Sequence, residues 1–171
     1  MNLIDSEGGF MARKPVFFSF HYGNDVMRVQ QVRNIGALEG NTPVSANDWE
    51  TVKRGGDASI KRWIDENLKY KQCVIVLVGE ETHARPWVKY EIEKAWNDGK
   101  PIFGIHIHNL ACPRNGKSLK GKNPFEQFTF ENGTKLSSIV SCYDPSPTET
   151  YKDIAENMES WVNKAIAQRK K

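Results

Sequence analysis

The sequence predicts an α/β domain in three layers, with a central, mostly parallel sheet covered by helices on both faces. Apolar, β-prone runs at 15–20, 73–78 and 102–107 alternate along the chain with amphipathic helical segments. The run 73–78 reads Cys-Val-Ile-Val-Leu-Val and has no polar position, as expected of a strand buried on both faces. Parallel neighbours need a crossover connection, and the helices between these runs supply it.

The first part of the chain contains a leader, a strand and a helix. Residues 1–14 are a polar leader, and the strand 15–20 follows it. Asp25 is expected to cap the next helix, which stops at Gly36, because Asp favours the N-cap and Gly the position after the last turn. The stretch that follows carries weak signals, with a short strand expected near 43–45.

The segments 58–68 and 86–97 carry clear helical signals. The first has apolar residues at i, i+3, i+4 and i+8, which is the stripe of an amphipathic helix: Ile60, Trp63, Ile64 and Leu68. The second opens with Pro86, whose missing N–H costs nothing in a first turn. Both helices are therefore expected to pack one face against the sheet.

The last third of the chain is expected to hold a loop, a short strand and a long helix. Residues 109–137 form a polar loop that is long for a compact domain, so we expect it to be either functional or mobile. A short strand is expected at 139–142. Ser146 begins a Ser-Pro-Thr-Glu capping box with Pro at the first helical position, which opens a helix over 147–168. Residues 15–171 are expected to form a single domain.

Composition argues against several classes of protein. The 171 residues carry a net charge of +3. Without the basic residues of one loop and of the C-terminus the net charge would be −4, which argues against a nucleic-acid-binding face. These residues are Arg114, Lys117, Lys120, Lys122, Arg169, Lys170 and Lys171. The longest apolar run, 73–78, is far shorter than the ~20 residues of a membrane span. Three cysteines without a CxxC motif indicate a reduced, cytoplasmic protein.

Three segments at the ends of predicted strands are expected to share one functional edge. They are 19–25, 79–83 and 106–109, and ligands bind at the carboxyl ends of strands in open parallel sheets. His106 and His108 are two residues apart, which puts both imidazoles on one face of a strand. With Cys112 nearby, a zinc site is conceivable. Spacing supplies no acidic third ligand, and we predict no metal site. The sequence also lacks a G-x-G-x-x-G or P-loop motif.

Glu91 and Trp87 are the candidate functional pair on the helix 86–97. At about 100° per residue, Glu91 lies roughly 60° from Val88, on the flank of the buried face. Trp87 stands one turn earlier, so the carboxylate and the aromatic ring are neighbours. This pair can form a pocket that stabilises a developing sugar cation and stacks on a base. The alternative is a boundary Glu paired with Lys94 and a Trp that covers the core.

The order of these segments resembles TIR domains over roughly residues 14–110. The apolar strand 73–79, the polar loop 80–85 and Trp-Val-Lys-Tyr-Glu-Ile at 87–92 are similar to the third TIR strand, its loop and the W-x-x-x-E helix. Val-Phe-Phe-Ser-Phe-His-Tyr at 16–22 resembles the first TIR box. With Asp-Trp-Glu at 48–50 and Gly-Ile-His-Ile at 104–107, the likeness is strongest to the ThsB-type TIR-like proteins of the bacterial Thoeris anti-phage defence system.

The resemblance implies a flavodoxin-like fold and cleavage of NAD at the nicotinamide–ribose bond by the helix glutamate, here Glu91. It also implies that the ADP-ribose product is cyclised into a second messenger, which activates a separate effector protein. NAD is then the substrate, and no other cofactor is implied. Homo-oligomerisation stays open.

On this hypothesis Glu91 stabilises the ribose cation, and five other residues bind the dinucleotide. Trp87 walls the pocket, Asp48 binds ribose hydroxyls, and the remaining three stack on or contact NAD: Phe20, His21 and Trp49. One rival is a non-catalytic TIR-like adaptor that acts by protein–protein contacts. A receiver-like signalling domain is another, but His21 and Tyr22 stand where a receiver needs clustered acids.

Overall fold

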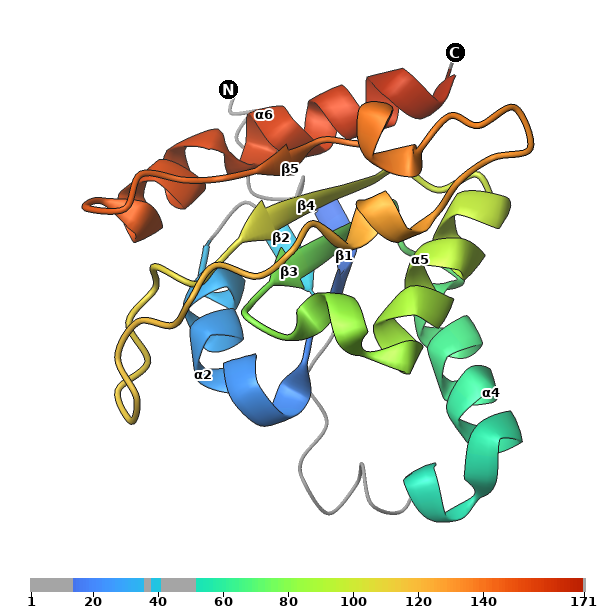
Figure 1. Cartoon of the computed structure of the whole chain (residues 1–171), viewed down its shortest axis with the longest axis horizontal. Helices are drawn as coiled ribbons and strands as arrows, with labels where there is room; N and C mark the ends of the chain where they lie inside the picture. The colour runs from blue at the N-terminus through green and yellow to red at the C-terminus, as the bar shows by residue number, and fades with distance from the viewer. Residues whose placement is uncertain (1–13, 36–37, 41–51, 171) are drawn as a thin grey trace, which may run out of the picture.

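The computed structural model describes residues 14–35, 38–40 and 52–170, which build one five-stranded sheet (Figure 1). All neighbouring strands are parallel, and their order is β2-β1-β3-β4-β5. The strands are β1 (Lys14–Ser19), β2 (Leu38–Gly40), β3 (Cys73–Val78), β4 (Ile102–His106) and β5 (Cys142–Tyr143). This order is the flavodoxin-like one, and it confirms the α/β prediction.

Helices cover both faces of the sheet, as Figure 1 shows. The helices α2 (Tyr22–Arg33) and α6 (Thr150–Lys170) pack on one face, and α4 (Gly56–Leu68) and α5 (Pro86–Asn97) on the other. Side chains of β1 alternate between these two cores: Val16 and Phe18 face α2 and α6, whereas Phe17 faces α4 and α5. All six residues of β3 are buried, as predicted for a central strand.

The connections place the functional edge between β1 and β3. The chain leaves β1 for the edge strand β2 and then returns to the other side of β1 as β3. Crossovers therefore diverge from the carboxyl ends of β1 and β3, and this divergence opens the crevice in which doubly wound folds bind ligands. The last residue of β1, Ser19, lies on the same side of the strand as Phe17. The Ser19 side chain therefore points toward α5.

The two helix starts that were predicted from capping residues differ in the structure. The helix α2 begins at Tyr22, so Asp25 lies in its first turn and does not cap it; instead its buried carboxylate pairs with Arg28 at 2.9 Å. The helix α6 begins at Thr150, three residues later than predicted. Ser146 Oγ accepts the Glu149 N–H at 3.3 Å, but the Ser146 N–H donates to Asp153 Oδ2 at 2.7 Å. Asp153 therefore closes the box that Glu149 was expected to close.

The loop 109–137 and the strand after it also differ from the prediction. The loop contains the 3₁₀ turn η2 (Pro124–Gln127), and the turn η3 (Leu136–Ser138) follows across its end. Phe125 is fully buried and Leu136 nearly so, and both join the core beneath α4 and α5, so the loop contributes to packing. The last strand, β5, lies at Cys142–Tyr143 and shares only Cys142 with the predicted span 139–142. The short strand expected near 43–45 lies outside the described residues.

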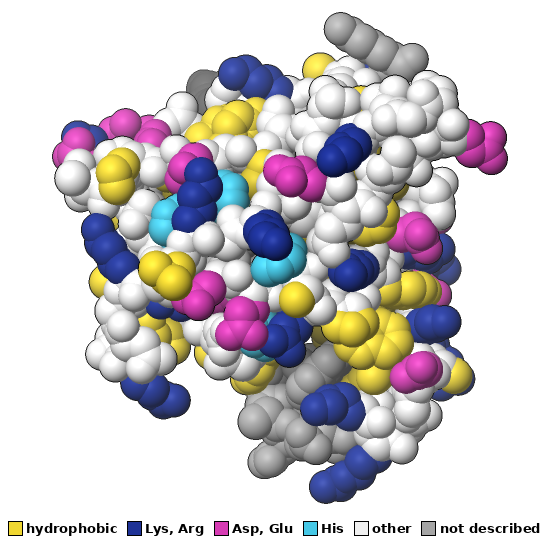
Figure 2. All heavy atoms as spheres, viewed as in Figure 1, with side chains coloured by type: hydrophobic (Ala, Val, Ile, Leu, Met, Phe, Trp, Pro, Cys, Tyr) yellow, Lys and Arg dark blue, Asp and Glu magenta, His cyan; other side chains and the backbone are white. Residues whose placement is uncertain are grey.

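Charges of both signs intermingle on the face seen in Figure 2. In the basic loop, Lys120 pairs with Asp144 at 2.8 Å and Lys117 donates to the carbonyl of Pro147 at 2.8 Å. These contacts tie the loop to the segment before α6. In the described part of the chain, no helix combines the length and the apolar character that crossing a membrane requires.

Candidate active site

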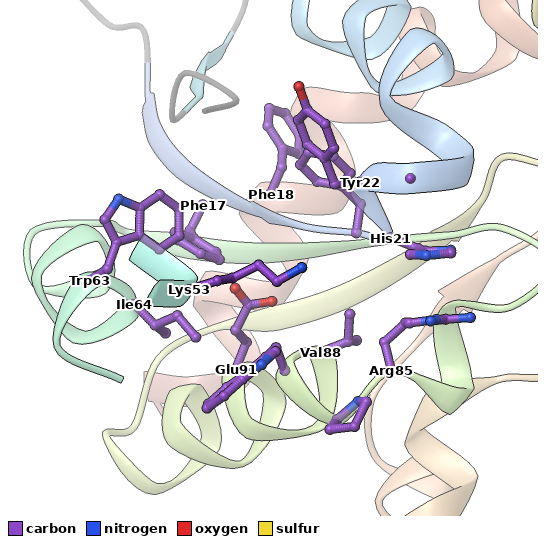
Figure 3. Close-up of a pocket in the computed structure, with 14 residues that line it drawn as sticks. Phe17, Phe18, His21, Tyr22, Lys53, Trp63, Ile64, Arg85, Val88 and Glu91 are labelled. Atoms are coloured by element: carbon purple, nitrogen blue, oxygen red, sulfur yellow. The ribbon is translucent and has the colours of Figure 1, made fainter. Parts of the chain in front are cut away.

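A cavity of about 420 Å³ lies at the carboxyl end of β1, between the start of α2, α4 and α5. Figure 3 shows the Glu91 carboxylate pointing from α5 into the space between Trp63 on one side and His21 and Arg85 on the other. Aromatic rings contribute much of the wall: Phe17, Phe18, Phe20, Tyr22, Trp63 and Trp87. The cavity therefore offers one buried acid, flanking cations and flat apolar surfaces.

Glu91 is buried, with 8% of its surface exposed, because its position on the flank of the apolar stripe turns it toward the sheet. Ser19 Oγ donates a hydrogen bond of 2.6 Å to Glu91 Oε1. Burial raises the pKa of Glu91 to about 8, and the Ser19 hydrogen bond opposes this rise. The carboxyl is thus largely protonated at neutral pH.

The alternative that pairs Glu91 with Lys94 is wrong, although Trp87 does pack against the core as that alternative expected. Lys94, the expected partner of Glu91 on the same helix, pairs instead with Asp98 at 2.9 Å. Glu91 and Trp87 both line the cavity. An uncompensated buried acid in a cleft is typical of a functional site rather than of a structural ion pair.

Three more of the predicted site residues line the same cavity. Phe20 and His21 extend from the end of β1, and half-buried Trp87 packs its ring edge-on against Tyr90 at 5.8 Å. Burial and the nearby Arg85 lower the pKa of His21, so its imidazole is neutral at pH 7. Asp48 and Trp49 lie outside the described residues.

Sequence reasoning did not single out Ser19, which contacts Glu91 without lining the cavity, or Trp63, Lys53 and Arg85, which are among the residues that line it. Ser19 was included only as part of the strand-end segment, and Trp63 only as part of the apolar stripe of its helix. Lys53 and Arg85 also line the cavity, and Arg85 is held by Glu81 at 2.7 Å. The available signal for Ser19 was its period of two with Phe17 at the end of a buried strand. No pattern indicated that Lys53 would approach the site.

The histidines at the end of β4 are a separate feature. His106 and His108 are both buried, with ring centroids 5.9 Å apart. Burial lowers the pKa of His106 to about 4, so the imidazole stays neutral at physiological pH. Cys112 contacts Met27, with its Sγ 3.8 Å from the Met27 Sδ. Among the residues that the structure describes, no group of three or more His, Cys, Asp or Glu side chains could hold a metal ion.

Comparison with known proteins identifies the family. The model for the TIR-like domain of the Thoeris protein ThsB matches residues 17–111, from β1 to just beyond β4. A protein of Bacillus cereus (strain MSX-D12), named "Putative cyclic ADP-D-ribose synthase ThsB1", is 34% identical over 148 residues, which cover 83% of this chain and 77% of that protein.

Among solved structures, an apo form of a double mutant of Etr1p matches with a TM-score of 0.32 and 15% identity. It covers 90% of this chain and 42% of its own, and so distant a likeness carries no argument. The family match spans the strands and helices that enclose Glu91, and the relative spans most of both chains. The chain therefore belongs to the ThsB-type TIR-like family of the Thoeris system.

Proposed function

We propose that this protein cleaves NAD at the nicotinamide–ribose bond, with Glu91 as the catalytic residue, and cyclises the ADP-ribose product. The observation that carries this proposal is the buried Glu91 carboxyl, which faces an aromatic-walled cavity at the end of β1. The name of the Bacillus cereus relative, a cyclic ADP-ribose synthase, supports the same reaction.

The electrostatics of Glu91 suit a cationic substrate. The nicotinamide ring of NAD is positively charged, and breaking its bond to ribose moves positive charge onto the sugar. A carboxylate in a water-poor cavity stabilises that charge more strongly than it would in bulk water. Burial raises the pKa of Glu91 to about 8, whereas a neighbouring cation lowers a carboxyl pKa. Substrate binding and ionisation of Glu91 therefore favour each other.

The aromatic wall supports both binding and cyclisation. Trp63 and Trp87 offer flat faces on which nicotinamide or adenine can stack. Phe20 and His21 flank the end of β1 and would contact the rest of the dinucleotide. Cyclisation requires that an atom of the ADP-ribose moiety, rather than water, forms the new bond to the ribose carbon that nicotinamide leaves. Apolar walls favour this outcome because they exclude water.

The proposed product defines the partner. NAD is the substrate, and the chemistry needs no further cofactor, because bond cleavage and ring closure exchange one bond to the ribose carbon for another. A cyclic ADP-ribose molecule diffuses away from the cavity. A separate effector protein would then read it, so the two proteins need not touch.

Incubation with NAD, with and without phage components as a trigger, tests the proposal. Nicotinamide is quantified by chromatography and the nucleotide product by mass spectrometry. We expect the unaltered protein and the control Glu93→Gln, exposed on the same helix, to release nicotinamide and form the cyclic product. Glu91→Gln should lose about 100-fold or more in rate. A folded Glu91→Gln protein with unchanged nicotinamide release would falsify the assignment. No release under any condition would favour the adaptor.

A further inference from the structure

We propose that Ser19 is a positioning residue of this site: its hydroxyl orients the Glu91 carboxyl and stabilises the ionised form that the reaction uses. This inference deepens the proposed function and rests on it. Ser19 reaches the substrate only through Glu91, so its effect should appear in the behaviour of that carboxyl.

The geometry carries the inference. Ser19 is fully buried, and the 72 residues that separate it from Glu91 are bridged by the parallel pairing of β1 with β3 and the crossover into α5. Its Oγ donates to Glu91 Oε1 at 2.6 Å. This length lies in the range of a hydroxyl donating to a carboxylate, and once Glu91 is ionised such a charge-assisted bond is about twice as strong as a neutral one. Of the described side chains, Ser19 alone donates a hydrogen bond to Glu91.

The bond opposes the effect of burial. A hydroxyl donor stabilises a neutral carboxylic acid only a little, whereas it stabilises a carboxylate strongly. Ser19 therefore favours the charged form within an apolar cavity that disfavours it. It also leaves Oε2 unrestrained by this bond, so that one oxygen remains available to the substrate. A strand residue is a rigid support, and Ser19 is paired with Val76 of the central strand β3.

Other charged groups near Glu91 face the cavity or are already paired. His21, Arg85 and Lys53 line the cavity. Two further pairs involve residues of α5: Tyr90 donates to Asp65, and Lys94 pairs with Asp98. None of these groups is removed by a change at Ser19. A change in the ionisation of Glu91 in a Ser19 variant is therefore attributable to the hydroxyl.

The first test is the pH dependence of kcat/KM for NAD, which reports the free enzyme. We expect the rate to rise with pH through the pKa of Glu91, about 8. In Ser19→Ala the midpoint of this rise should move up by about one pH unit, so that kcat/KM falls about tenfold at pH 7 and less than twofold at pH 9.5. Ser19→Thr retains a hydroxyl and should restore the midpoint, and Ser160→Ala, exposed on α6, should match the unaltered protein. An equal loss of kcat/KM at every pH, with no shift of the midpoint, would overturn the inference.

The second test needs no turnover and separates this inference from the proposed function. The carboxyl carbon of Glu91 is titrated by ¹³C NMR and assigned by its absence in Glu91→Gln. Ser19→Ala should titrate about one pH unit higher than the unaltered protein. If the protein cleaves no NAD but this shift is present, the proposed reaction fails while the support by Ser19 stands. If Glu91 titrates at the same pH in both proteins, the positioning role is refuted, whatever the activity.

Discussion

The stability of Glu91→Gln relative to the unaltered protein should increase with pH. Burial raises the folded-state pKa of Glu91 to about 8 from an ordinary value of 4.5. Above pH 4.5 the unfolded chain releases this proton while the folded protein keeps it. The unfolded state then binds fewer protons, so the free energy of unfolding falls as the pH rises, until the folded carboxyl also ionises.

The magnitude follows from the difference between the two pKa values. Each pH unit in this window costs about 1.4 kcal/mol, so the penalty is about 3 kcal/mol at pH 7 and approaches about 5 kcal/mol above pH 8. Gln cannot ionise and escapes this penalty. Its amide oxygen can accept the Ser19 hydroxyl in place of the carboxylate. Burying its NH₂ group adds a cost of about 1–3 kcal/mol, but that cost does not vary with pH.

Urea unfolding followed by tryptophan fluorescence measures this difference, since the chain has five tryptophans. The free energy of unfolding is compared at pH 5, 7 and 8.5 for the unaltered protein and for Glu91→Gln. Glu93→Gln removes an exposed carboxyl from the same helix and should stay within about 0.5 kcal/mol throughout. A difference between Glu91→Gln and the unaltered protein that does not change with pH would refute the raised pKa and the burial argument behind it.

Three further predictions concern other parts of the molecule. Trp87→Ala should raise the KM for NAD about tenfold through loss of a stacking face, which initial rates of nicotinamide release would show; an unchanged KM would remove Trp87 from the binding site. Arg28→Ala strands the buried Asp25 carboxylate and should cost about 3–5 kcal/mol in urea unfolding, partly recovered by adding Asp25→Asn. His106→Asn should flatten the loss of stability between pH 6.5 and about 4, because the buried imidazole resists protonation in the folded state only; a melting-temperature profile that keeps its slope would contradict this.

Local signals were sufficient for the strands and helices that frame the site. The apolar run at β3 and the Pro at the start of α5 predicted both elements correctly, because burial on two faces and a proline first turn leave direct marks in composition. Periodicity also placed Glu91 toward the sheet. Periodicity could not decide whether Lys94 would pair with Glu91, since Glu91 and Asp98 both lie within reach of Lys94 on the helix.

Signals of the same kind failed where two partners competed for one group. Asp25 has the preference of an N-cap residue, yet a buried Arg28 one turn later binds its carboxylate and holds it inside the helix. The loop 109–137 is polar on average, and the buried residues Phe125 and Leu136 belong to no periodic apolar pattern that would have predicted their burial.

By itself the sequence predicted the α/β class, the family and a glutamate, Glu91, on the flank of the buried face of its helix. Tertiary structure decided the surroundings of that glutamate. The Ser19 hydroxyl reaches Glu91 only because β1 lies beside β3 in parallel and α5 crosses back over them, a contact between residues 72 positions apart. Burial and hydrogen bonding act through space, and the pKa of Glu91 depends on both. No spacing along the chain encodes them.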